Sequence, residues 1–261
     1  MKIFINTSFS LLTLHLVLGT FLTCTFATNN KYYISGKVGY NWISELNSNE
    51  QTVSITDTRH IVAGGEPLKF DRTVTNDFKL KNSFDFGISL GKHFDKYRIE
   101  GEMSYFKTKA TSQHLVMTTE PTNADADQYP PYTVDEVDTD IDRTLGKLSI
   151  GVNGYYDLET STIFVPYAGL GLGLSFVSIS DKFDDDNKST KITTVGAFKF
   201  MLGTQIRCSK QFSLLFEYEL TATSKFSYLE PNEKEKVQGF EDYKSGLLIN
   251  SINIGGKYTI A

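Results

Sequence analysis

The stretch Phe84-Asp85-Phe86-Gly87-Ile88-Ser89-Leu90-Gly91 decides the fold, because a large apolar residue alternates with a small or polar residue throughout it. Successive side chains of a β-strand point to opposite faces of a sheet, so this stretch predicts a strand with one apolar and one polar face. Seven other runs show the same alternation. The eight runs are residues 32–42, 84–91, 97–105, 147–156, 168–176, 198–206, 212–220 and 248–260.

The connections between these runs alternate in length. Short connections, such as the His93–Lys96 and Cys208–Gln211 turns, follow the second, fourth and sixth runs. The other connections are polar stretches of about 40, 35, 12 and 25 residues. Short turns at one end and long loops at the other, with an even number of strands, are typical of bacterial outer-membrane barrels. The pattern predicts an all-β, eight-stranded antiparallel up-and-down transmembrane barrel with four long extracellular loops.

The two faces of the predicted strands indicate which side meets lipid. The apolar face carries Tyr and Trp near the strand ends, as an aromatic girdle does. The polar face carries five basic and five acidic side chains, which we expect to pair because an unpaired buried charge costs several kcal/mol. An eight-stranded barrel is just wide enough for such side chains. We therefore predict a plugged lumen with a charge network of Lys37, Asp85, Arg98, Glu100, Glu102, Lys147, Lys199, Glu217, Glu219 and Lys257.

The N-terminus predicts export. Lys2 is followed by an apolar run from Leu11 to Phe26, and the small residue Ala27 suits signal peptidase, so we expect a signal peptide at 1–27 and a barrel domain at 28–261. A transmembrane anchor is the alternative, but the apolar run is short for one. The net charge of −5 does not favour binding to nucleic acid.

Two glycine-containing motifs resemble catalytic or nucleotide-binding sequences. Gly87-Ile88-Ser89-Leu90-Gly91 matches the elbow of serine hydrolases, and Gly169-Leu170-Gly171-Leu172-Gly173 resembles a nucleotide loop. Both motifs normally lie where a strand turns into a helix, whereas here the strand alternation continues through them. We interpret their glycines as lumen-facing residues that make room for larger neighbours. The chain is therefore not expected to be an enzyme or to bind a cofactor.

The segment from Glu120 to Asp142 contains eight acidic residues and no basic residue. A binding site for a cationic partner is one interpretation, with Asp135, Glu136, Asp138, Asp140 and Asp142 as the candidate partner-binding loop. Solvated surface loops are the plainer alternative. A calcium-binding loop motif is absent from the sequence, and the four histidines are not spaced as in a metal site, so no metal site is predicted.

Two further stretches resemble a known family. Residues 152–158 (Val-Asn-Gly-Tyr-Tyr-Asp-Leu) and 164–173 (Phe-Val-Pro-Tyr-Ala-Gly-Leu-Gly-Leu-Gly) are similar to sequences of the surface-antigen barrels of rickettsia-type bacteria. That group contains major surface protein 4, P44, OMP-1 and the Wolbachia surface protein, within the OmpA-like eight-stranded outer-membrane barrels. Residues 32–35 and 98–102 resemble its first and third strands. The resemblance implies an immunodominant surface protein with adhesin or porin-like roles and supplies no catalytic residues.

Together these observations predict a protein of the cell outer membrane with its loops exposed at the cell surface. The lipid bilayer is one expected partner, and host surface or extracellular proteins that contact the loops are the others. The expected function is that of a surface antigen without catalysis. A small porin-like channel for solutes is the alternative, which the balanced lumen charges disfavour.

Overall fold

The computed structural model describes residues 31–44, 46, 51–61, 66–123, 129–138, 143–184, 187–229 and 243–260 of the 261-residue chain. Regular structure within these ranges is entirely β-strand. None of the described residues belongs to a helix that could cross a membrane. The signal peptide predicted at residues 1–27 lies outside the described residues.

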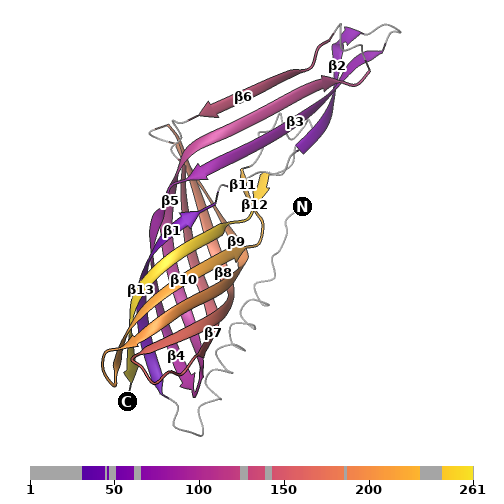
Figure 1. Ribbon diagram of the computed structural model, residues 1–261. Helices are drawn as coiled ribbons and strands as arrows, with labels where there is room; N and C mark the ends of the chain where they lie inside the picture. Colours follow the sequence, from indigo (N-terminus) through magenta and orange to yellow (C-terminus); the bar gives the residue numbers. More distant parts are fainter. Residues whose placement is uncertain are drawn as a thin grey trace, which may run out of the picture.

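Eight strands form a closed antiparallel barrel (Figure 1). They follow one another in the order β1-β4-β5-β7-β8-β9-β10-β13, and β13 pairs with β1, where Tyr32 lies opposite Ile260. Closure pairs both edges of every barrel strand, and the eight-stranded prediction is confirmed. The strands are β1 (Tyr32–Ile43), β4 (Ser83–Phe94), β5 (Tyr97–Pro121), β7 (Arg143–Asp157), β8 (Phe164–Asp184), β9 (Asn187–Arg207), β10 (Phe212–Thr223) and β13 (Leu248–Ile260).

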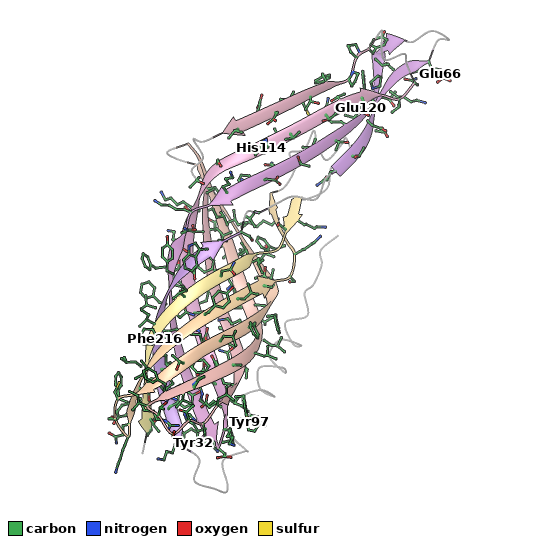
Figure 2. The ribbon with its side chains drawn as sticks, viewed as in Figure 1. Tyr32, Glu66, Tyr97, His114, Glu120 and Phe216 are labelled. Carbon is green, nitrogen blue, oxygen red and sulfur yellow. The ribbon has the colours of Figure 1, made fainter. Side chains whose placement is uncertain are left out.

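The alternation along β4 gives the barrel an apolar exterior. Phe84, Phe86 and Leu90 are at least 60% exposed, whereas Asp85 and Ser89 are buried on the inner face. Large apolar side chains exposed in this way form a continuous belt when the barrel lies in lipid. Tyr32, Tyr97 and Phe216 lie on this outer surface (Figure 2).

Two tight turns close the lower end of the barrel. In the β4–β5 turn Asp95 has a φ of 59°, a left-handed conformation that Asp adopts more readily than most residues. In the β9–β10 turn the Ser209 hydroxyl accepts hydrogen bonds from the backbone N–H groups of Gln211 and Phe212, at 3.2 and 2.9 Å. These turns hold the ends of four strands together at one mouth of the barrel.

The other end continues into a sheet that we call the extension (Figure 1). It contains β2 (Gln51–Ile61), β3 (Pro67–Leu80), the second half of β5, and β6 (Tyr132–Asp138), in the order β2-β3-β5-β6. A short hairpin of β11 (Phe226–Leu229) and β12 (Tyr243–Ser245) lies beside it. The sequence had led us to expect loops in these regions, and that prediction was wrong.

The extension was missed because its strands alternate only weakly in hydropathy. One face is rich in hydroxyl groups that pair across strands, as Thr52 and Thr73 do at 2.9 Å. The other face carries apolar residues such as Val74, Leu115 and Met117. The high content of Thr and Val in these segments was the signal that could have identified them, because both residues favour strands. β5 itself is a single strand of 25 residues that belongs to both the barrel and the extension.

Candidate functional site

The centre of the barrel contains a cluster of two lysines and three glutamates, which we call the lysine–glutamate cluster. Lys37 Nζ lies 2.9, 3.1 and 2.8 Å from carboxylate oxygens of Glu102, Glu217 and Glu219. Lys199 Nζ lies 2.5 Å from Glu102 and 3.0 Å from Glu219. These side chains come from β1, β5, β9 and β10, so the cluster joins opposite walls of the barrel. Such buried charges are stable only when they are paired.

Glycines on neighbouring strands make room for the cluster. A Cβ at Gly87 would lie 3.1 Å from Lys37 Cγ, and a Cβ at Gly255 would lie 3.1 Å from Lys37 Cβ. On β8 a Cβ at Gly171 would lie 3.2 Å from Lys199 Cβ. Side chains at these positions would crowd both lysine stems. The lumen-facing interpretation of the two glycine motifs therefore agrees with the geometry.

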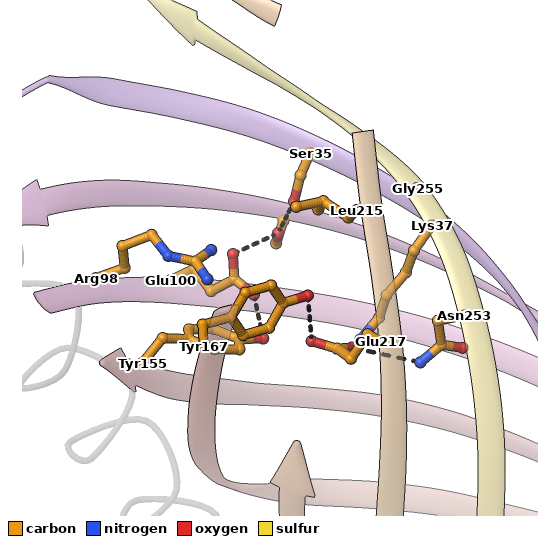
Figure 3. Close-up of a pocket in the computed structure, with 11 residues that line it drawn as sticks. Ser35, Lys37, Arg98, Glu100, Tyr155, Tyr167, Leu215, Glu217, Asn253 and Gly255 are labelled. Atoms are coloured by element: carbon orange, nitrogen blue, oxygen red, sulfur yellow. Dashed lines mark hydrogen bonds and ion pairs between the residues drawn. The ribbon is translucent and has the colours of Figure 1, made fainter. Parts of the chain in front are cut away.

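A second group lies below the cluster and centres on Arg98. Its guanidinium carbon is 4.4 Å from the ring centre of Tyr155 and 4.7 Å from that of Tyr167, and Nε donates a 2.9 Å hydrogen bond to Asp157. Glu100 accepts a hydrogen bond from the Tyr155 hydroxyl at 2.7 Å (Figure 3). The hydroxyls of Tyr33 and Ser89 also donate to Glu100, at 3.0 and 3.1 Å. Hydroxyl groups thus take the place of a cation at this carboxylate.

Four of the ten predicted network residues have no ion pair among the described residues. One is Glu100, whose partners are the hydroxyl groups just described, and the others are Lys147, Asp85 and Lys257. Lys147 Nζ lies 5.5 Å from the ring centre of Phe106. Asp85 Oδ1 is buried with no hydrogen-bond partner among the described residues. Lys257 is hydrogen-bonded to His93 and Gln205. The expectation of complete pairing was therefore wrong, because the ten residues lie at several levels of the lumen and not in one layer.

The upper part of the lumen is apolar, which the sequence analysis did not predict. Inward-facing side chains at the upper ends of the barrel strands form a cluster that we call the apolar plug. It continues into Leu46, Phe78, Phe226 and Leu247, which lie above the strand ends. The barrel strands contribute Phe106, Leu145, Val177, Ile179, Val195 and Ile249.

The lumen is packed closely at both levels. The cavity lined by Ser35, Tyr155 and Glu217 has a volume of about 20 Å³ (Figure 3), and two others, one beside Lys199 and one beside Lys147, have about 10 Å³ each. A water molecule needs roughly 10–15 Å³ of such volume. These cavities therefore hold about one water molecule each.

The predicted partner-binding loop is partly a strand. Asp135, Glu136 and Asp138 belong to β6, and only Asp140 and Asp142 lie outside the described residues. Asp135 and Glu136 are exposed, and Asp135 Oδ1 lies 2.7 Å from His114 Nε2 on β5. Among the strands that the structure describes, β6 pairs with β5 alone, so it forms an edge of the extension.

The hydrolase-like motif shows no catalytic geometry. Ser89 lies in the middle of β4 inside the lumen, where its hydroxyl donates to Glu100. A nucleophile elbow would instead expose the serine on a strand-to-helix turn. Among the described residues, no group of three or more His, Cys, Asp or Glu side chains could hold a metal ion.

Residues 13–258 match the model of the outer membrane protein beta-barrel domain family. The chain belongs to this family. The protein is thus an outer-membrane barrel with its apolar belt in the lipid bilayer. A search among curated proteins gave no significant match.

Solved outer-membrane barrels are similar to this chain in fold. Neisserial surface protein A is 14% identical, with a TM-score of 0.47 over 88% of this chain and 99% of that chain. Ail, the attachment invasion locus protein of Yersinia pestis, in complex with the heparin analogue sucrose octasulfate, is 12% identical, with a TM-score of 0.43 over 89% and 100%. The outer membrane protease OmpT from Escherichia coli is 10% identical, with a TM-score of 0.38 over 90% and 98%.

Proposed function

We propose that this protein is a surface antigen that contacts host molecules through its extension, and that the barrel is a sealed support for that extension. The observation that carries the proposal is the filling of the lumen at two successive levels, by the apolar plug and by the lysine–glutamate cluster. A solute would have to displace both levels to pass through the barrel. The porin-like alternative is therefore disfavoured.

The extension supplies the contact surface in this proposal. It projects beyond the barrel, with Glu66 and Glu120 towards its tip and His114 nearer the barrel (Figure 2). Its edge strand β6 exposes Asp135 and Glu136. A partner that binds this edge would be basic, and its binding would weaken as salt screens the exposed charges. The resemblance to rickettsia-type surface antigens supports a host origin for that partner.

Binding of the purified protein, in neutral-lipid nanodiscs, to cultured animal cells tests this proposal. The double variant Asp135→Asn/Glu136→Gln removes two negative charges from the β6 edge without changing side-chain size. Each exposed ionic contact contributes roughly 0.2–1 kcal/mol, so loss of both contacts is expected to slow association about two- to thirtyfold at low salt. Wild-type binding is expected to fall as salt is raised.

The matched control is Glu66→Gln/Glu120→Gln, which removes the same charge near the tip of the extension. This control is expected to bind within twofold of wild type. Equal binding by wild type and the β6 variant at low salt would show that the acidic edge is only solvated surface. An equal loss in both variants would mean that net charge, and not the β6 edge, controls attachment.

A further inference from the structure

The lower mouth of the barrel, at the end with the tight turns, contains a cavity of about 260 Å³ that the proposed function does not use. It is more than ten times larger than the cavities between the lumen side chains. Basic, amide and hydroxyl side chains from β9, β10 and β13 line its wall, among them Gln205, Arg207, Ser213, Lys257 and Thr259.

Lys257 is a buried cation without an acidic partner. Lys257 is only 1% exposed. Its ammonium group is hydrogen-bonded to His93 Nε2, at 3.2 Å, and to Gln205 Oε1. Among the described residues, no carboxylate oxygen lies within the 4.0 Å of an ion pair with Lys257. A buried charge with only neutral partners is costly unless a counter-ion is bound.

A second cation lies at the same level of the wall. Ser213 on β10 is directly opposite Arg207 on β9 and Lys257 on β13. Neighbouring strands are about 4.8 Å apart, so the two cationic residues lie roughly 10 Å apart on one face with a hydroxyl between them. Ser213 Oγ accepts a 3.0 Å hydrogen bond from Gln205, which leaves its own proton available to a ligand.

The acidic residues of the cavity do not neutralise these cations. Asp157 is held by Arg98, at 2.9 Å. Asp95 and Glu159 are exposed residues of the lower end, where Lys31 and Lys210 also lie. With Asp157 matched by Arg98, the cavity keeps a positive balance that comes from Arg207 and Lys257.

We propose that this mouth binds a phosphate group between Arg207 and Lys257, with the Ser213 hydroxyl as a third donor. A phosphate accepts several hydrogen bonds at once, and a guanidinium can donate two of them in parallel. The cavity of about 260 Å³ is large enough to hold a phosphate together with part of a larger molecule that carries it. Free inorganic phosphate and a phospholipid headgroup have this chemistry in common.

Calorimetric titration with inorganic phosphate tests the site in the full barrel, in alkyl maltoside micelles that contain no phosphate. One phosphate per chain is expected to bind saturably. Arg207→Gln is expected to weaken binding at least tenfold, and Arg207→Lys to restore part of it. The matched control Lys69→Gln, which removes an exposed positive charge from β3, is expected to change the affinity less than twofold.

Two results would overturn the proposal: no saturable binding to wild type, or the same loss in Lys69→Gln as in Arg207→Gln. A competition experiment then identifies the source of the phosphate. If short-chain phosphatidylglycerol displaces inorganic phosphate, the site takes a lipid headgroup. If it does not, the site takes the free ion. Circular dichroism and resistance to urea check that each variant is folded.

Discussion

Replacing Lys37 by methionine tests the lysine–glutamate cluster most sharply. The ammonium group of Lys37 contacts three carboxylates within 3.1 Å, and Lys199 contacts only two of them. Without Lys37, the partners that Glu217 retains among the described residues are Tyr167, at 3.3 Å, and Asn253, at 3.4 Å. The buried cluster then gains one uncompensated negative charge. Breaking a buried pair costs about 3–5 kcal/mol, so Lys37→Met should lower the free energy of unfolding by about that amount.

Urea unfolding in lipid vesicles measures this change. Trp42 is the single tryptophan of the chain and lies on the outer surface of the barrel, so its fluorescence reports when the barrel leaves the bilayer. Lys37→Met/Glu217→Gln restores the charge balance and should recover part of the loss. Lys107→Met, at an exposed position, should change stability by less than about 0.5 kcal/mol. If Lys37→Met unfolds like wild type, water solvates the charges and the lumen is not sealed by them.

Three other predictions follow from individual contacts. Gly91→Ala should impair folding, because the added Cβ would collide with the Tyr33 ring. Gly101→Ala should be tolerated, because nothing lies within 4 Å of a Cβ at that position. Heat-dependent gel mobility of the refolded proteins measures both effects. Arg98→Lys should lower the free energy of unfolding by about 1–3 kcal/mol, since lysine cannot reproduce the ring stacking and the Asp157 hydrogen bond together; urea unfolding measures it, and no change would contradict the assigned contacts. Cys208 is exposed in the β9–β10 turn and should escape membrane-impermeant maleimide on intact cells, whereas Glu120→Cys in a Cys208→Ser background should react. Labelling of Cys208 alone would reverse the orientation.

The barrel was predictable because lipid imposes a simple pattern. Phe86 and Leu90 must face lipid while Asp85 and Ser89 face the lumen. Alternation along the chain therefore indicates directly which side of the barrel wall each side chain occupies. The same logic failed in the extension, where water contacts β6 and the face that carries Val74 and Leu115 also carries the polar residue Asn76. Only composition marks those strands, and composition does not define where they begin or end.

The candidate site was predictable as a set of inward-facing residues but not as a set of contacts. Alternation indicates that Lys37 and Glu219 share the lumen, yet their pairing depends on barrel closure, which joins residues 182 positions apart. Asp157 was missed because it ends its strand and looks like a turn residue. The apolar plug was missed because Leu145 and Val177 lie just beyond the predicted runs 147–156 and 168–176, whereas the strands β7 and β8 continue through them.

Current recording across planar lipid bilayers that contain the purified protein tests the central claim most directly. A barrel closed by the apolar plug and the lysine–glutamate cluster should give no regular conductance steps, in wild type or in Glu219→Gln. Steps of uniform size in wild type that change in size in Glu219→Gln would assign an ion current to this lumen. That result would contradict the sealed barrel and restore the porin-like function.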